Sequence, residues 1–589
     1  MPSQALKAME LDAPISDYIP YSYHVSDTVV STKRGEYLSV WRLAGRPHES
    51  ASPSDVFRWL EDLNNVLRGM AALGRFGIQT TINRRRQFAY PDSQFDNYFC
   101  RALDEKYRAS FTSVRTMVNE LYVTIVLRPE DQVVGFLSRA EKQSASDRQA
   151  RQDAAIETLT ETNQMLGAAL RKYGPELLSV YERDGRMYSQ VLEFFGQIVN
   201  GEHMPMPILS KYRISEYLSQ NRVLFAQHGE LGEIRSVDSQ RRFGMLEIAE
   251  YPDITGPGHL NQLLSSDFEF VLTQSFAMLT RAAGLSYLKK HQRHMADAKD
   301  AAIAQVQQLT VAMNDLMSGS FVMGEHHATL LVYGDTAQDV RDNLAQARSM
   351  MVDVAVLPKM VDLALEAGFW AQLPCNWEFR PRPAVITSLN FLSFSSFHNF
   401  HTGKAEGNPW GPAVTMFKTT SGTPLYFSFH ASGIDEDATD KRTLGNTMVI
   451  GPSGGGKTVL LDFLIAQSQK FKPRVVVIDK DQGTEVAVRA MGGRYLPLKM
   501  GEPSGFNPFQ LEPTPGNLIF LKQLVMELVS GVAKVTHQDE QEIDQAIQGM
   551  MTLVERKDRR LSTLMLTLPD PQVRDSDHPT VASRLRKWT

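Results

Sequence analysis

The sequence is poor in cysteine, has no long apolar run and carries no strong excess of charge of either sign. Its two cysteines, Cys100 and Cys375, lie far apart among 589 residues, which argues against a disulfide framework and is typical of a reducing compartment. No stretch approaches the run of about 18 apolar residues that crosses a membrane as a helix. The N-terminus shows no basic segment followed by an apolar run, so no cleaved signal is expected. A formal net charge of −5 argues against a dominant nucleic-acid-binding surface.

The remaining composition is that of a globular protein with several domains. Apolar residues make up 42% of the chain and charged residues 22%, which are ordinary values. A chain of 589 residues is too long for one hydrophobic core, and usual domain sizes predict roughly three or four folding units. The sequence contains no internal repeat and no low-complexity tract.

Strand patterns are frequent in the N-terminal part. Residues 22–45 alternate like paired strands about a turn at residues 33–35, and further strand-like runs occupy residues 77–82 and 121–127. Strands are also predicted at residues 244–248 and 329–333. With the helices that separate them, these runs predict an α+β region.

Helical patterns lie between these runs. Ser54 and Asp55 open a predicted helix, residues 138–173 predict a long helix with a solvated polar middle, and residues 260–317 read as a further helical run. The apolar face predicted for the first of these helices consists of Phe57, Leu60, Leu63, Val66 and Leu67.

A change of composition marks a predicted domain boundary near residue 405. Residues 391–412 are rich in loop formers and aromatic residues. Residues 413–430 then predict a hairpin about the turn at residues 421–424.

Residues 446–458 carry the most informative motif. Gly451, Gly456, Lys457 and Thr458 satisfy the Walker A pattern G-x-x-x-x-G-K-[ST]. The apolar residues 447–450 predict a strand before the loop, and residues 459–470 predict a helix after it. Strand, loop and helix thus follow in the order that a nucleoside-triphosphate site needs.

The residue types of this loop suit a triphosphate. Backbone N–H groups at a helix N-terminus attract an anion, and glycines let the backbone approach it closely. Lys457 is expected to reach the β- and γ-phosphates, and the Thr458 hydroxyl to ligate Mg²⁺. ATP and Mg²⁺ are therefore the predicted cofactors, and Lys457 and Thr458 the predicted catalytic residues. The predicted ATP-binding residues are Gly451, Pro452, Ser453, Gly454, Gly455, Gly456, Lys457 and Thr458.

Asp479 is a second candidate at the nucleotide edge. It ends an apolar run at residues 475–479 that predicts a buried strand, and parallel sheets place their sites at such strand ends. A Walker B role is disfavoured, because this strand follows the Walker A helix directly and because Lys480 stands where a water-polarising glutamate is expected. Asp479 either approaches the magnesium or is a strand-end carboxylate nearby.

Other polar clusters have simpler interpretations. The basic runs 84–86 and 556–560 could touch phosphates, but solvated faces or protein contacts explain them more readily. The histidine pairs at 291/294 and 398/401 lack nearby cysteines or a carboxylate set, so ordinary surface and loop roles are favoured over zinc.

An ordered series of segments resembles the secretion ATPases of the CagE, TrbE and VirB family. The resemblance runs over most of the chain from about residue 20, which makes it far more specific than the Walker A loop alone. It rests on FGMLEIAEYPDIT at 243–255, SGSFVMGEHHATLLVYG at 318–334, FWAQLPCNW at 369–377, NFLSFSSFHNFHTGKAEGNPWG at 390–411, GTPLYFSFH at 422–430, the Walker A loop, VVVIDKDQG at 475–483, and MGGRYLPL and SGFNPFQL within 491–511.

This resemblance implies a fold and a setting. An α+β N-terminal region would be followed by an α/β RecA-like P-loop NTPase domain. The expected divisions are an assembly subdomain at 1–175, a second α+β subdomain at 176–405 and the first part of the ATPase domain at 406–589. The family implies a homo-oligomer, a hexamer or a trimer of dimers, associated peripherally with the cytoplasmic face of the bacterial inner membrane. Its partners would be other inner-membrane subunits of a type IV secretion system and a transient DNA or protein substrate.

The chain departs from the family pattern at one point. The family's Walker B strand, with its Asp-Glu pair, has no counterpart after Gly516, because residues 517–560 read as helices. We therefore expect the catalytic glutamate, the sensor and the arginine finger beyond Thr589, so that the ATPase domain is incomplete here and poorly active alone.

Three functions are consistent with these observations. The first is an ATPase motor that couples hydrolysis to pilus biogenesis and substrate transfer. The second is a DNA-pumping translocase of the coupling-protein type, which the net charge and the absence of membrane-spanning helices disfavour. The third is a nucleotide-gated assembly scaffold with little hydrolysis.

Overall fold

The computed structural model describes residues 14–72, 75–88, 90–112, 116–129, 145–226, 230–297, 303–433, 437–499, 502, 504–569 and 579–589. The chain divides into two units, Met1–Val476 and Val477–Thr589, which are described separately below.

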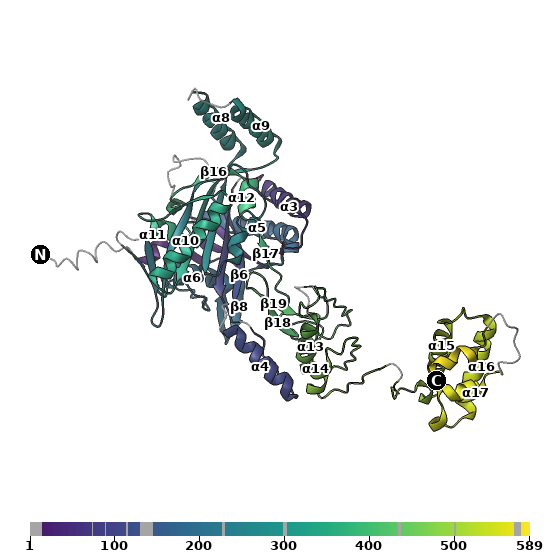
Figure 1. Ribbon diagram of the computed structural model, residues 1–589. Coiled ribbons are helices and arrows are strands. Elements are labelled where there is room, and N and C mark those ends of the chain that lie inside the picture. The colour runs from purple at the N-terminus through teal and green to yellow at the C-terminus, as the bar shows by residue number, and fades with distance from the viewer. Residues whose placement is uncertain are drawn as a thin grey trace. The chain divides into compact units, whose positions relative to one another are not determined.

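A large antiparallel sheet organises the first unit (Figure 1). It has 13 strands, three of which pair beside the main path: β7 (Pro175–Leu177), β15 (Leu357–Met360) and β16 (Ala384–Thr387). The main path runs through β1 (Tyr21–His24), β2 (Val30–Thr32), β3 (Tyr37–Leu43), β6 (Met117–Leu127), β5 (Phe76–Arg86), β13 (Phe270–Met278), β14 (Met323–Gly334), β12 (Gln240–Glu250), β11 (Leu231–Arg235) and β10 (Arg222–Phe225).

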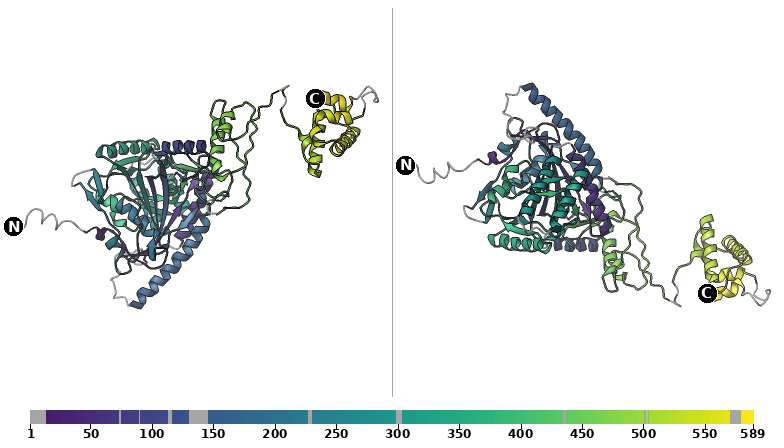
Figure 2. Two further views of the ribbon diagram at one scale, coloured as in Figure 1. Left: turned by 90° about the horizontal axis from the view of Figure 1, so that it is seen from below. Right: turned by 90° about the horizontal axis from the view of Figure 1, so that it is seen from above.

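Helices cover both faces of this sheet (Figures 1 and 2). Successive residues of β6 alternate between the faces: Leu121, Val123 and Ile125 pack in one core, and Tyr122 and Val126 pack in the other. The helices α6 (Gln190–Asn200) and α11 (Leu365–Trp370) cover the second face. The first face is covered by α3 (Pro53–Ala71), α5 (Ala145–Ala169), α10 (Ala337–Asp353) and α12 (Ser388–Phe394).

Smaller elements complete the first unit. Helices α8 (Arg281–Asp297) and α9 (Ile303–Ser318) project from the sheet as a pair (Figure 1). The remaining helices are α2 (Ile15–Tyr18), α4 (Tyr98–Thr112), α7 (Ile214–Tyr217) and α13 (Lys457–Ser468). The remaining strands are β4 (Arg46–Pro47), β8 (Val180–Arg183), β9 (Arg186–Ser189), β17 (His398–Asn399), β18 (Thr415–Lys418) and β19 (Pro424–Phe427).

Most of the predicted strands are confirmed, but the helical run predicted at 260–317 is wrong over its first part. Residues 261–265 form a 3₁₀ turn, and β13 follows before α8 and α9 begin. Every residue of β13 is buried, because β5 pairs with it on one side, β14 on the other, and helices cover both faces. Because both faces are buried, apolar and polar residues do not alternate along β13, and the sequence shows no period of two that would mark a strand.

The predicted helices show smaller differences. The Ser52 hydroxyl, rather than Ser54, caps α3 by accepting from the Asp55 amide, and Phe57 is 56% exposed instead of lying in the buried face. Of the helix predicted at 138–173, the structure describes α5 and a 3₁₀ turn, while residues 138–144 lie outside the described residues. The hairpin predicted at 413–430 is confirmed as β18–β19.

The strands predicted at 447–450 and 475–479 are not formed. Neither segment pairs with a strand among the residues that the structure describes. Met448 and Ile450 are 82% and 85% exposed, and Ile478 is 98% exposed. An apolar run becomes a strand only when neighbouring segments pair with its N–H and C=O groups, and that pairing is missing in these segments.

The second unit is helical. After α14 (Glu485–Ala490), a core forms from α15 (Pro515–Ser530), α16 (His537–Leu553), α17 (Leu561–Thr567) and α18 (Val581–Leu585). Thr514 caps α15, and a reciprocal capping box between Thr536 and Asp539 begins α16. These helices confirm the prediction for residues 517–560.

The predicted domain bounds 1–175, 176–405 and 406–589 remain a prediction. Strands from both of the first two ranges share the single sheet, which passes from β5 directly to β13. Among the described helices, none combines the length and the apolarity needed to cross a membrane.

The second unit contains a buried ion pair, and we expect its loss to lower the stability of this unit. Arg584 Nη2 lies 2.7 Å from Asp539 Oδ1, and both side chains are 2% exposed. Replacing Arg584 with Ala leaves the Asp539 carboxylate buried without its counter-ion, which should cost about 3 kcal/mol of local stability. Hydrogen exchange of the α16 amides in the full chain measures this loss.

The matched control is the exposed pair Lys557–Glu555, whose side chains are 75% and 74% exposed. Lys557→Ala should cost less than about 1 kcal/mol. Equal effects of the two substitutions would show that burial of the Arg584 pair does not matter.

Candidate nucleotide site

The Walker A loop leads directly into helix α13. Gly456 is the N-cap residue, and Lys457 is the first residue of the helix. Gly454 and Gly456 have φ angles of 77° and 83°, a backbone conformation that favours glycine. A Cβ atom at either position would meet no neighbour within 4 Å, so the backbone angle rather than lack of space explains these two glycines.

The Lys457 side chain folds back over its own loop. Its Nζ donates to the carbonyl oxygens of Gly451, at 3.0 Å, and of Pro452, at 2.8 Å. The Gly455 amide donates to the same Pro452 oxygen at 3.2 Å. The ammonium group therefore lies over the loop, held by neutral acceptors that an anion can replace.

The predicted binding residues are brought together on an exposed surface. Residues 451–456 and Thr458 are exposed, and Lys457 is half-buried. The first amides of a helix have no partner within the helix, so the start of α13 offers N–H donors beside an ammonium group and a hydroxyl group. These groups fit a triphosphate with its magnesium ion, although their roles in binding remain a prediction.

Asp479 belongs to a local turn of the second unit. Its Oδ2 accepts from the Thr484 amide at 3.0 Å, the Thr484 hydroxyl at 2.9 Å and the Tyr495 hydroxyl at 3.2 Å, and its Oδ1 accepts from the Asp481 amide. These hydrogen bonds, that of the Thr484 amide foremost, lower the pKa of the Asp479 carboxyl group. The carboxylate thus stabilises the turn before α14, and an approach to magnesium remains a prediction.

Sequence reasoning missed the residues that support α13. Helix α4 contacts it through Tyr107 and Asp104, which meet Phe463 and Gln467. The only signal in the sequence was the four-residue spacing of Phe463 and Gln467, which places them on one face of the helix. Nothing in that spacing identifies α4 as the partner, because α4 lies more than 300 positions earlier in the chain.

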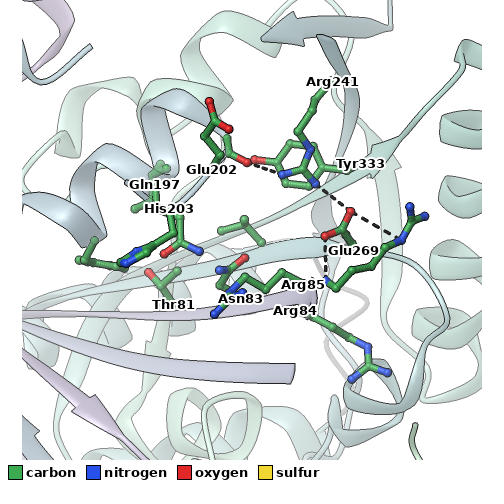
Figure 3. Close-up of a pocket in the computed structure, with 15 residues that line it drawn as sticks. Thr81, Asn83, Arg84, Arg85, Gln197, Glu202, His203, Arg241, Glu269 and Tyr333 are labelled. Carbon is green, nitrogen blue, oxygen red and sulfur yellow. Dashed lines mark hydrogen bonds and ion pairs between the residues drawn. The ribbon is translucent and has the colours of Figure 1, made fainter. Parts of the chain in front are cut away.

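A separate cavity lies under the C-terminal end of α6 (Figure 3). Its volume is about 240 Å³, and it is lined by Arg241 together with five residues of β5, namely Thr81, Asn83, Arg84, Arg85 and Arg86. This volume is below the range of roughly 300–1,000 Å³ that is usual for ligand pockets.

The arginines of this cavity are already engaged. Arg241 lies 3.0 Å from Glu269 and stacks on the Tyr333 ring, with 3.8 Å from Cζ to the ring centroid. Arg85 lies 2.7 Å from Glu120. Arg84 points to other partners and donates to the Ser266 and Ser421 carbonyls, while burial lowers its pKa to about 10. The basic run 84–86 therefore makes protein contacts, which favours α13 over this cavity as the nucleotide site.

Comparison with known families covers most of the chain. Residues 28–134 match the "Type IV secretion system ATPase VirB4/TrbE, N-terminal domain". Residues 176–382 match the "CagE, TrbE, VirB family, component of type IV transporter system", and residues 413–562 match the "TraG P-loop domain".

Whole-chain relatives agree with these matches. Type IV secretion system protein virB4 of Brucella suis is 39% identical over 605 residues, covering 100% of this chain and 72% of that protein. The chain belongs to the CagE, TrbE, VirB family. The virB4 protein of Bartonella henselae is 37% identical over 99% of this chain and 72% of its own length. PtlC of Bordetella pertussis is 35% identical over 98% of this chain and 70% of its own length.

The family assignment fits the geometry of α13. The match to the TraG P-loop domain contains the whole Walker A loop and α13. The resemblance inferred from the sequence is thereby confirmed, and the chain is a type IV secretion component with a P-loop domain.

Magnesium dependence tests the place of Thr458 in this P-loop. Thr458→Val keeps the size of the side chain but removes the hydroxyl group, so nucleotide affinity should lose most of its dependence on Mg²⁺. Calorimetric titration with ATP, with and without Mg²⁺, measures the effect. Thr458→Ser keeps the hydroxyl group and should behave like the wild type. A Val variant that still responds fully to Mg²⁺ would remove Thr458 as the ligand.

Proposed function

We propose that this chain is an ATP-driven motor of a bacterial type IV secretion or conjugation system, in which ATP hydrolysis drives pilus biogenesis and the transfer of DNA or protein. The observation that carries the proposal is the Walker A loop at the start of α13 in a member of this secretion family. The names of the relatives, type IV secretion system proteins virB4 and PtlC, support the setting.

The chemistry follows from the groups at the start of α13. Lys457 exchanges the Gly451 and Pro452 carbonyls for phosphate oxygens, and the free amides of the first helical turn receive the remaining oxygens. The Thr458 hydroxyl holds magnesium, which neutralises charge on the phosphates when it is bound. These groups hold and orient the triphosphate, and the attacking water needs a further group.

The assembly is proposed on the family's organisation. The P-loop domain is RecA-like and works in a homo-oligomer, either a hexamer or a trimer of dimers. The N-terminal region attaches the motor to other subunits at the cytoplasmic face of the inner membrane, where the DNA or protein substrate is engaged. Membership of the CagE, TrbE, VirB family supports this arrangement.

Substitution of the P-loop lysine tests the motor function. Lys457→Ala should abolish ATPase activity and leave the fold intact, because the exposed hydrogen bonds of the side chain join it to Gly451 and Pro452 of its own loop. The loss of transition-state stabilisation should be at least about 3 kcal/mol. Steady-state ATP turnover measures it, with circular dichroism as the control for folding. If the wild type shows measurable turnover and the variant matches it, the loop is removed from the mechanism.

A nucleotide-gated scaffold is the second candidate, and the engagement of Asp479 in a turn favours it. We expect residues 1–589 to bind ATP but to hydrolyse it slowly in a single turnover, and Asp479→Asn to leave that rate unchanged. A carboxylate that activates water would instead contribute on the order of 10²-fold or more. A rate loss of that size in the Asn variant, or fast hydrolysis by the wild type, would contradict this expectation.

A further inference from the structure

Helix α13 is supported unevenly along its length. Leu464, Ala466 and Gln467 are buried in its C-terminal half. Thr458 and Val459 in its first turn are exposed, and Val459 is 72% exposed. The direction in which the phosphate-binding end points is therefore set by the contacts of the opposite end.

Helix α4 packs against α13, and the two helices are neighbours in Figure 1. The Tyr107 and Phe463 rings meet at 4.6 Å between centroids, with 60° between their planes. One turn further along α13, Gln467 Nε2 donates to Asp104 Oδ1 at 3.1 Å. Residues three or four apart share a helix face, so the two pairs join one face of α4 to one face of α13.

The polar pair of this contact is buried, and both Asp104 and Tyr107 have further hydrogen-bond partners. Asp104 and Gln467 are 5% and 1% exposed, and Asp104 also accepts from the Tyr90 hydroxyl at 2.6 Å. The Tyr107 hydroxyl donates to the Met416 carbonyl in β18 at 3.1 Å. Burial raises the pKa of Tyr107 to about 12, so its hydroxyl stays a donor at neutral pH.

The residues just before α4 hold the chain that follows α13. Lys470 Nζ donates to Ser93 Oγ at 3.0 Å, and Lys472 Nζ lies 2.6 Å from Asp96 Oδ2. The segment 90–112 thus contacts α13 and its C-terminal extension at several successive points. This segment connects β5 to β6, which are neighbours within the large sheet.

We propose that Asp104 and Tyr107 are positioning residues for the P-loop, which link nucleotide binding at α13 to the sheet of the N-terminal region. This inference rests on the proposed function, because it requires nucleotide at Lys457. Gln467 lies about 15 Å along the helix axis from Lys457, at about 1.5 Å per residue, so a tilt at the α4 contact displaces the amides that receive the phosphates. Linkage is reciprocal, so bound nucleotide also stabilises the α4 contact.

Two variants and their controls test the inference in the full chain. Tyr107→Leu and Gln467→Met should each weaken ATP binding about ten-fold, within the usual range of coupling between sites. Tyr107→Phe keeps the ring contact and should retain near wild-type affinity. Lys106→Ala changes an exposed residue of the same helix and should have no effect.

Hydrogen exchange distinguishes a role of the α4 contact in positioning the P-loop from a role in stabilising the fold alone. ATP should slow exchange of the α4 amides in the wild type and in Lys106→Ala, but not in Tyr107→Leu. If ATP does not slow exchange of the α4 amides in the wild type, although ATP still binds in a Lys457-dependent manner, the inference is overturned. The proposed function then remains intact. ATP binding and turnover that both survive Lys457→Ala unchanged would instead overturn the proposed function. If both variants keep the wild-type ATP affinity but have a lower melting temperature, the contact stabilises the fold and does not position the P-loop, which would also overturn the inference.

Discussion

The candidate site lies at the N-terminal end of α13 and depends on the contacts that hold the C-terminal end of this helix. The start of α13 offers free amides, the Lys457 ammonium and the Thr458 hydroxyl, and it is exposed. An exposed helix start has a defined direction only if the rest of the helix is anchored. Burial of Gln467 against α4 provides that anchor, so this contact fixes the position of the candidate phosphate-binding loop.

The anchor is firm because α4 belongs to a region that buries a large core. It joins β5 to β6, and both strands are hydrogen-bonded on their two sides within the sheet. Arg84 of β5 also donates to the Ser421 carbonyl in the turn between β18 and β19. Phe417 of β18 meets Phe463 of α13 with 6.1 Å between ring centroids. The sheet is therefore connected to α13 through both α4 and the β18–β19 hairpin, which joins the N-terminal region to the candidate nucleotide site.

Local sequence patterns predicted many of the helices and strands. The features that they did not predict depend on contacts between residues far apart in the sequence. The Walker A spacing identified α13 and its glycines, since φ angles and helix starts are local properties. The burial of β13 on both faces removed the period that would have shown it to be a strand. Residues 447–450 have the composition of a strand without the pairing that makes one. The contact of Asp104 with Gln467 joins distant segments, so no local pattern could predict it.

Peptide-resolved hydrogen exchange with and without ATP and Mg²⁺ tests whether nucleotide binds at the start of α13. ATP should slow exchange in the peptide containing residues 451–460, where the amides of the helix start would contact phosphate oxygens. Protection confined to the cavity beneath α6, with unchanged exchange across residues 451–460, would contradict this expectation.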